Sequence, residues 1–299
     1  MPELPEVQTV VNNLNNSNAI NNKIISVSVL SPKLLKNATT SEFTKFVVNE
    51  KIVSFKRKGK YIECYLSNKK VILIHLRMEG KLFCENKKII SSQNEMTEGK
   101  YWSEAKLGNS EFKNLHPPMK HLRISLILVN EWFLNFYDSR MFGTFHIYTL
   151  TSLADSPELK KVGYDAIGDD FNDKYLYEIT RNSSKAIKTF ILDQSKVSGI
   201  GNIYADEILF ASKINPMMDT KNITIKQCHD FVVNTKQILN ESILSGGTTF
   251  ATFASDNQHI GAYQNKLKVY GKTNQKCLVC GTMIKKTTVN GRGTHYCPK

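Results

Sequence analysis

The chain has 299 residues, which is enough for about two domains with cores of their own. Hydrophobic residues make up 41% of the sequence without an apolar run long enough to span a bilayer, so composition predicts a globular protein without a membrane span, and we expect no membrane partner. Forty Lys and Arg against 27 Asp and Glu give a net charge of +13, which favours nucleic acid as the partner over a membrane surface or an unspecialised basic surface. The first residues lack the basic and apolar segments of a secretory signal, which predicts the cytoplasm.

The opening MPELPEV has two interpretations. Removal of Met1 leaves the secondary amine of Pro2 as a free nucleophile with Glu3 beside it. Alternatively, Pro2 and Pro5 form a short extended segment, or a P-x-x-P ligand, before a helix over residues 7–14. These seven residues alone favour the second interpretation.

Short runs rich in β-branched and aromatic residues follow, separated by turn residues. They predict a β-sandwich or barrel that extends to about residue 150 and is built from residues 23–30, 51–66, 70–83, 122–129 and 132–148. Between residues 85 and 118 the pattern becomes a polar loop, which we interpret as a functional loop or an insertion.

After residue 150 the hydrophobic periodicity becomes helical. Helices are expected over residues 169–182, 185–194, 201–213 and 224–244. The Gly-, Thr- and Ser-rich residues 246–266 predict a loop before the C-terminal cysteines.

The last 23 residues contain three cysteines in a pattern typical of a zinc ribbon. Cys277 and Cys280 have the spacing of one metal-binding knuckle, and Cys297 opens a second. We expect one structural zinc ion with an incomplete ligand set, because the fourth cysteine is absent from the sequence. Residues beyond Lys299, His295 or a water molecule are the candidates for the fourth ligand.

A Gly-x-Gly turn precedes the helix expected at 201–213 and places Asn202 at its N-cap. Such a turn directs backbone N–H groups and the positive end of the helix dipole outward, which suits an anion such as DNA phosphate. A tight turn with no ligand is the alternative. A dinucleotide site is excluded because no strand precedes the turn.

Two kinds of turn in the β region suggest contact with DNA. KRKGKY places Arg57, Lys58 and Lys60 around a turn that suits phosphate, although an exposed basic hairpin is the simpler interpretation. HLRMEG and DSRMFG each end in a turn-forming glycine and present large residues at the tip. In proteins that kink DNA, apolar side chains beside an arginine enter the base stack as wedges. A single residue of this kind more often packs in the core or on the surface.

These motifs together resemble the bacterial formamidopyrimidine-DNA glycosylases, which remove 8-oxoguanine and ring-opened purines. PELPEV, KRKGKY, HLRMEGKL, DSRMFG, ILDQSKVSGIGNIYADEILF, GGTTF and GRGTHYCPK occur in the family's order across nearly the whole chain. The resemblance implies an α+β multidomain fold: a β-sandwich with flanking helices over 2–150, a helical helix–two-turn–helix domain over 151–250, and a lesion loop with a zinc ribbon over 251–299.

By this resemblance Pro2 matches the nucleophile that attacks C1′ of the damaged nucleotide. Glu3 matches the carboxylate that acts as acid and base at the sugar, Glu6 a supporting carboxylate, and Lys60 a lysine that contacts phosphate and assists elimination. The adjacent placement of Pro2 and Glu3 suits proton transfer at hydrogen-bond range.

The resemblance also assigns DNA-binding residues in this chain. They are the void-filling Met78, Arg140 and Phe142, of which Arg140 reads the opposing cytosine; the phosphate-binding Asn202 and Arg292; and His75 before the Met78 turn. Residues 254–263 correspond to a loop that covers the extruded base. Met141 replaces a second arginine that is frequent in the family, and the missing cysteine puts the ribbon's metal in doubt.

The implied protein is a cytoplasmic, nucleoid-associated bacterial monomer that binds damaged double-stranded DNA. It is a bifunctional glycosylase and AP lyase that forms a proline Schiff base and cuts by β,δ-elimination. An oxidised-pyrimidine glycosylase and a non-catalytic damaged-DNA-binding protein are the alternatives.

Overall fold

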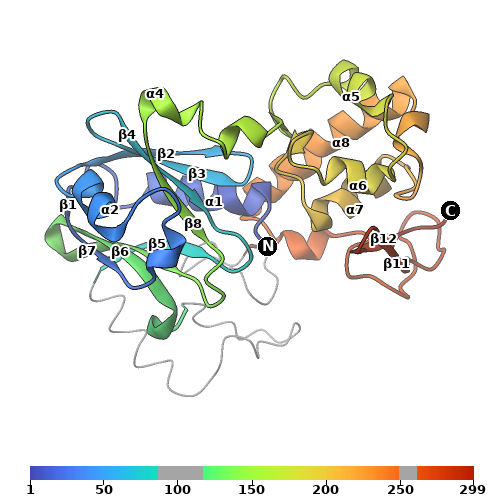
Figure 1. The fold of residues 1–299 in the computed structure, drawn as a ribbon. Helices are drawn as coiled ribbons and strands as arrows, with labels where there is room; N and C mark the ends of the chain where they lie inside the picture. Colours follow the sequence, from blue (N-terminus) through green and yellow to red (C-terminus); the bar gives the residue numbers. More distant parts are fainter. Residues whose placement is uncertain (87–116, 249–260) are drawn as a thin grey trace. The chain divides into compact units, whose positions relative to one another are not determined.

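The computed structural model describes residues 1–86, 117–248 and 261–299. They form two compact units, drawn in Figure 1: a first unit of Met1–Leu159 with Gly246–Ala262, and a second unit of Lys160–Ser245 with Tyr263–Lys299. Within these ranges no helix combines the length and the apolar character needed to cross a membrane.

The first unit is a sandwich of two four-stranded antiparallel sheets, as predicted. One sheet has the order β1-β6-β7-β5, with β1 (Ile24–Val29), β5 (Lys81–Asn86), β6 (Leu122–Leu128) and β7 (Trp132–Tyr137). The other has the order β2-β3-β4-β8, with β2 (Ile52–Lys58), β3 (Tyr61–Leu66), β4 (Lys70–His75) and β8 (Thr144–Thr149). The α-helices in the described part of this unit are α1 (Leu4–Asn15), α2 (Thr40–Val47) and α4 (Leu150–Leu153).

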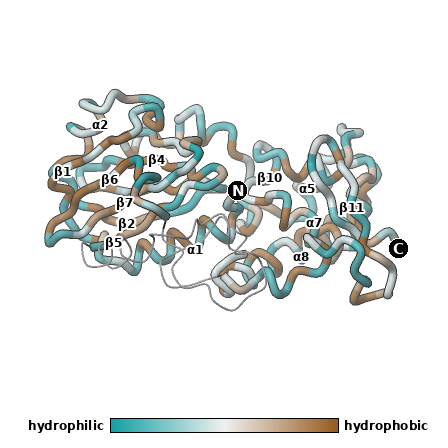
Figure 2. Tube along the Cα trace, turned by 90° about the horizontal axis from the view of Figure 1, so that it is seen from below, coloured by the Kyte–Doolittle hydropathy of each residue, from teal (hydrophilic) through white to brown (hydrophobic). Residues whose placement is uncertain are grey.

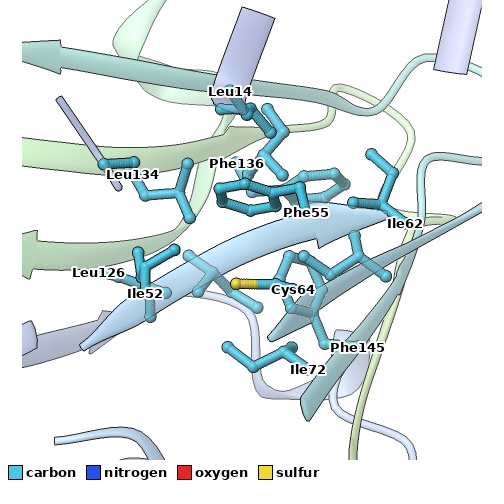
Figure 3. Close-up of a cluster of buried hydrophobic side chains, with 14 of the residues drawn as sticks. Leu14, Ile52, Phe55, Ile62, Cys64, Ile72, Leu126, Leu134, Phe136 and Phe145 are labelled. Carbon is cyan, nitrogen blue, oxygen red and sulfur yellow. The ribbon is translucent and has the colours of Figure 1, made fainter. Parts of the chain in front are cut away.

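The core of this unit lies between the sheets, because each strand directs alternate apolar residues inward. Both sheets contribute aromatic and branched side chains to one cluster, and α1 and α2 add theirs to it. Figure 3 shows Phe136 of one sheet among Phe55, Cys64 and Phe145 of the other. Figure 2 shows the corresponding hydrophobic stretches along the strands.

The second unit is mainly helical, again as predicted. It contains α5 (Asp173–Thr180), α6 (Ile187–Ile191), α7 (Asn202–Ala211) and α8 (Ile225–Leu244). The short strands β9 (Tyr164–Asp165) and β10 (Val197–Ser198) pair in parallel, and β11 (Lys285–Val289) with β12 (Arg292–Tyr296) forms the antiparallel hairpin of the ribbon. Figure 1 shows this hairpin in red.

Candidate functional site

The first helix begins almost at the N-terminus of the chain. α1 starts at Leu4, and Glu3 and Glu6 form a capping box at its N-terminal end. Pro5 is therefore a residue of the first helical turn, where its missing N–H costs nothing. The prediction of an extended P-x-x-P segment before a helix at 7–14 is wrong.

Pro2, Glu3 and Glu6 are all buried, and Glu6 connects two distant parts of the chain. One carboxylate oxygen, Oε2, accepts a hydrogen bond from the Glu3 N–H at 2.9 Å. The other, Oε1, accepts from the N–H and the hydroxyl of Thr248, both at 2.8 Å. Glu6 thus ties the N-terminus to Thr248 of the GGTTF motif.

Gly247 makes this contact possible. Its φ is +80°, and a Cβ atom there would lie 3.0 Å from Glu6 Oε1. The sequence identified the GGTTF motif but not Thr248 as the partner of Glu6, because the pair is separated by 242 residues.

Lys60 follows the tight turn at Gly59, whose φ of +56° suits glycine, between β2 and β3. Its side chain is only 5% exposed. The nearby Arg57 donates from Nε to Gln8 Oε1 at 2.9 Å and from a terminal nitrogen to the Gly59 carbonyl at 2.9 Å. The interpretation of this turn as an exposed basic hairpin is therefore wrong for Lys60.

Charges gather around the N-terminal amine, which in this chain belongs to Met1. Burial lowers the pKa of this amine below its ordinary value, and the Lys60 ammonium acts in the same direction. Glu3, Glu6 and Glu79 raise the pKa, since negative charges stabilise the protonated amine. The structure thus brings the predicted Glu3, Glu6 and Lys60 together and adds Glu79.

Two turns of the first unit present the predicted wedge residues. Met78 is 39% exposed and Phe142 is 50% exposed, and the Arg140 guanidinium lies 4.8 Å from the centre of the Phe142 ring. Each turn ends at a glycine, Gly80 or Gly143, that the sequence motif predicted to be turn-forming. An added Cβ atom on Gly80 would lie 2.4 Å from the Leu76 carbonyl oxygen of its own turn and 2.7 Å from the Phe136 ring, and one on Gly143 would lie 2.4 Å from that ring. The tight turn and the packing of Phe136 together require glycine at Gly80, and the packing of Phe136 requires it at Gly143.

Asp138 holds the Arg140 turn and was not predicted. Its side chain is buried and accepts hydrogen bonds from the backbone N–H groups of Arg140, Phe142 and Gly143 at 2.8 to 3.0 Å. Met141, with a φ of +56°, turns its side chain back toward the core. Met141 thus adds an apolar contact to the core of the first unit.

The two wedge turns are also joined to each other, because Ser139 Oγ donates a hydrogen bond to Glu79 Oε2. Below the Met78 turn lies His75, which is 7% exposed and accepts from the Arg77 N–H at 2.9 Å. Burial, first of all, lowers the pKa of His75 to about 3, so its ring is neutral. The structure therefore places His75 underneath the turn.

In the second unit, α7 begins at Asn202 and its N-cap residue is Gly201. The prediction of Asn202 as the N-cap is wrong, because its side chain turns away from the helix and donates to the Gly293 carbonyl at 3.0 Å. This bond brings Asn202 next to Arg292, which is exposed at the start of β12. The two predicted phosphate-binding residues are thus neighbours.

A buried ion pair fixes this part of the ribbon. Lys188 and Asp206 have side chains that are 0% exposed, with Nζ 2.7 Å from Oδ1. Lys188 also donates to the Gly293 carbonyl at 2.8 Å and to Thr294 Oγ1 at 2.9 Å. Asp206 Oδ2 accepts from the His295 N–H at 2.8 Å and lies 3.3 Å from His295 Nδ1.

The three cysteines of the ribbon converge on one point. The sulfurs of Cys277, Cys280 and Cys297 lie within 4.8 Å of one another, and those of Cys280 and Cys297 are 3.4 Å apart. Tetrahedral zinc–thiolate geometry requires sulfur separations of about 3.8 Å, so the set fits zinc. Among the described residues this metal-binding group does not include His295, which faces Asp206 instead.

Two predicted features lie outside the described residues. They are most of the polar loop at 85–118 and most of the lesion-covering loop at 254–263. The chain that flanks the second loop is described, and there an added Cβ atom on Gly261 would lie 2.4 Å from the Gly247 carbonyl oxygen. Gly261 thus approaches the backbone of Gly247 more closely than any residue with a side chain could.

Family models match three successive parts of the chain. They are the formamidopyrimidine-DNA glycosylase N-terminal domain over residues 1–145, the formamidopyrimidine-DNA glycosylase H2TH domain over 162–254, and a zinc finger found in FPG and IleRS over 274–299. The formamidopyrimidine-DNA glycosylase of Ureaplasma parvum serovar 3 is 45% identical over 298 residues, covering 100% of this chain and 98% of the relative. That of Mycoplasma pneumoniae is 39% identical over 299 residues, with coverage of 100% and 98%.

Solved structures of the Lactococcus lactis protein have the same fold. Its complex with DNA that contains an abasic site is 31% identical, with a TM-score of 0.83. Its complexes with DNA that contains Fapy-dG or an oxidised pyrimidine have TM-scores of 0.82 at the same identity. Each comparison covers 99% of this chain and 98% of the other. The chain belongs to the formamidopyrimidine-DNA glycosylase family.

Proposed function

We propose that the chain is a bifunctional DNA glycosylase and AP lyase of base-excision repair that removes 8-oxoguanine and formamidopyrimidines from duplex DNA. One observation carries the proposal: the N-terminal amine lies among acidic and basic side chains on the unit that also presents two wedge-bearing turns. A non-catalytic DNA-binding protein has no use for such an amine.

The reacting group is the secondary amine of Pro2, which is exposed by removal of Met1. A base inside the stack is inaccessible, so the damaged nucleotide is flipped out at a cost of a few kcal/mol. The unprotonated amine attacks C1′, the bond to the base breaks, and the base leaves with a proton. The opened sugar and the amine form an iminium ion, which acidifies the C2′ proton, and β- and then δ-elimination cut both sides of the sugar.

Burial lowers the pKa of the Met1 amine in this structure. We expect burial to act in the same direction on the Pro2 amine and so to raise its unprotonated fraction at neutral pH. Glu3 exchanges protons with the sugar at hydrogen-bond range. Glu6 holds the Glu3 N–H and Thr248, so it orients the reacting residues without itself reacting. Lys60 contacts phosphate and assists elimination.

Met78, Arg140 and Phe142 fill the gap left by the flipped nucleotide, and Arg140 reads the opposing cytosine. His75 supports the Met78 turn from below through the Arg77 N–H. Filling the gap offsets the stacking energy that flipping loses.

Asn202 and Arg292 bind backbone phosphate, and the N–H groups at the start of α7 assist them. Cys277, Cys280 and Cys297 hold one zinc ion, which stabilises the ribbon and takes no part in the chemistry.

We divide the chain functionally into the catalytic residues 2–150, the DNA-binding residues 151–250 and the lesion-loop and ribbon residues 251–299. The protein acts as a monomer in the bacterial cytoplasm, on the DNA of the nucleoid.

Borohydride trapping on a duplex with one 8-oxoguanine opposite cytosine tests the proposal. The processed protein gives a covalent protein–DNA adduct, whereas a Pro2→Gly variant and a form that retains Met1 give little or none. A processed wild-type protein that forms no adduct would contradict the enzymatic assignment and favour a non-catalytic binder.

The same preparation distinguishes the lesion classes. Excision from an 8-oxoguanine duplex and from a thymine glycol duplex is compared under identical conditions. We expect the purine lesion to be removed faster, and a clear preference for thymine glycol would assign the chain to oxidised pyrimidines.

A further inference from the structure

Residues 193–201 connect α6 to α7 and lead directly into the phosphate-binding Asn202. We name them the two-turn segment. Only Val197 and Ser198 have strand conformation, and Gly199 has a φ of +103°. Such a segment has little regular backbone pairing to hold it, so its position depends on specific contacts.

Gln194 cross-links the segment from inside. Its Nε2 donates to the carbonyls of Leu192 at 3.0 Å and Ile200 at 2.8 Å. Its Oε1 accepts from the Gly199 N–H at 3.0 Å. One side chain therefore fixes both sides of the turn that presents Gly201 and Asn202.

Tyr175 holds the segment from outside. Its hydroxyl, projected from α5, donates to the Lys196 carbonyl at 2.8 Å. The ring is half-buried against Tyr164, with ring centres 4.6 Å apart. This contact ties the segment to a helix that is distant in sequence.

β9 supplies a third support. The Gly163 N–H donates to the Gln194 carbonyl at 2.8 Å, and the Ala166 N–H donates to the Ser198 carbonyl at 3.0 Å. The approach is so close that a Cβ atom on Gly163 would lie 2.6 Å from the Lys196 carbonyl oxygen. The two-turn segment is thus enclosed by α5, β9 and its own glutamine.

We propose that Tyr175 and Gln194 are positioning residues that hold the two-turn segment in its phosphate-binding conformation. Neither side chain contacts DNA; each acts through the backbone N–H groups at the start of α7 and through Asn202. The inference rests on the proposed function, since it assumes that this turn binds a DNA phosphate.

The physical reason is geometric. Hydrogen bonds weaken steeply when donor and acceptor lose alignment, and a backbone turn has no flexible side chain to restore it. A binding site made of main-chain groups must therefore be held to within about 0.5 Å by the residues around it. Tyr175 and Gln194 provide this support with four hydrogen bonds to the segment or its flanking residue Leu192.

A thermodynamic cycle between protein and DNA tests the proposal. Single phosphates around an 8-oxoguanine are replaced one at a time by uncharged methylphosphonate, and the dissociation constant of each duplex is measured. The proteins are wild type, Tyr175→Phe, Gln194→Glu and the control Tyr177→Phe. Tyr177 lies on the same helix, and its ring contacts Arg181.

For wild type, replacement of the phosphate at the turn weakens binding. Tyr175→Phe weakens binding of the natural duplex by about two- to tenfold, and the penalty for that methylphosphonate shrinks by a similar factor. Gln194→Glu weakens binding and shrinks that penalty more strongly. The substitution removes the two N–H donors of Nε2 and places a carboxylate oxygen against the carbonyls of Leu192 and Ile200. Tyr177→Phe behaves as wild type.

A positioning role changes the binding penalty of one methylphosphonate only. A general loss of stability, in contrast, leaves the penalty of every methylphosphonate unchanged. The single-turnover excision rate at saturating DNA stays within about twofold of wild type for Tyr175→Phe.

If wild type is trapped on the lesion but both variants show additive penalties at every phosphate, the positioning role is wrong and the proposed function stands. If wild type neither binds nor is trapped, the proposed function is wrong, and this inference with it.

Discussion

In the first unit the candidate reacting groups are ionisable side chains buried at the start of α1 and at the turn after β2. In the second unit the candidate phosphate-binding groups are a backbone turn, an asparagine and an exposed arginine. The charged side chains that support them, Lys188 and Asp206, are buried. Glu3, Glu6 and Lys60 are each at most 5% exposed, whereas Arg292 is exposed and Lys188 and Asp206 are enclosed.

The two sets of residues differ because catalysis and phosphate binding have different physical requirements. Proton transfer and attack by an amine need groups whose pKa values depend on burial and on neighbouring charges. Phosphate binding needs donors in fixed positions, and a positive charge that stays accessible to solvent and DNA. A substitution in the first unit should therefore change the chemical step, and one in the second unit should change binding or stability.

Glu3→Gln should have the largest effect. The amide cannot exchange protons, so excision of 8-oxoguanine should slow by about 10²- to 10⁴-fold, while binding of lesion DNA persists. Single-turnover excision and a binding titration measure the two effects separately. Glu42→Gln, which alters the capping carboxylate of α2, serves as the control and should leave excision unchanged. Near-normal excision by Glu3→Gln would contradict the role of Glu3.

Lys188→Met should instead act on stability. It leaves Asp206 buried without its ion-pair partner, which should lower the free energy of unfolding by about 3–5 kcal/mol. Adding Asp206→Asn to that variant removes the remaining charge and should recover part of the loss. Denaturant unfolding of the three proteins checks this. A single variant as stable as wild type would show that the ion pair does not hold the ribbon.

Asp138→Asn tests the wedge turn. The carboxylate accepts three backbone N–H groups, and an amide offers only one oxygen, so at least one N–H loses its partner at a cost of about 1–3 kcal/mol. Affinity for lesion DNA and preference for cytosine opposite the lesion should both fall. Unchanged preference would mean that the Arg140 turn keeps its shape without this carboxylate.

Glu79→Gln should have the smallest effect, and it concerns pH. The negative charge of Glu79 raises the pKa of the Met1 amine, and we expect it to act in the same direction on the Pro2 amine, so its removal should lower that pKa. Because the unprotonated amine is the nucleophile, the rate of borohydride trapping on abasic DNA should reach its upper plateau at lower pH in the variant. A shift of this midpoint to higher pH would contradict the arrangement.

Much of this protein was readable from its sequence. Alternating apolar runs predicted the two sheets, because burial of one face of a strand leaves a period of two. The helical periods predicted α5, α7 and α8, and the cysteine spacing predicted the ribbon. The order of the motifs identified the family, which the family models and relatives confirm.

Local patterns failed where a residue's environment is built by distant parts of the chain. The local pattern predicted that Pro5 belongs to an extended segment. In the structure α1 packs against the sandwich and begins at Leu4, so Pro5 lies in its first turn. The local pattern also placed Asn202 at an N-cap, but a partner 91 residues away turns that side chain toward the ribbon. The turn pattern predicted Gly80 and Gly143, but not the Phe136 ring that packs against both positions.

The elements, the family and the chemical types of the candidate residues were therefore predictable from the amino-acid order, because they depend on spacing along the chain. The partners, in contrast, become visible in the folded chain: Thr248 for Glu6, Asp138 for the wedge turn, Asp206 for Lys188 and Tyr175 for the two-turn segment. Pairs of this kind depend on which side chains the fold brings within about 3 Å of each other, and no period or motif in the chain encodes that distance.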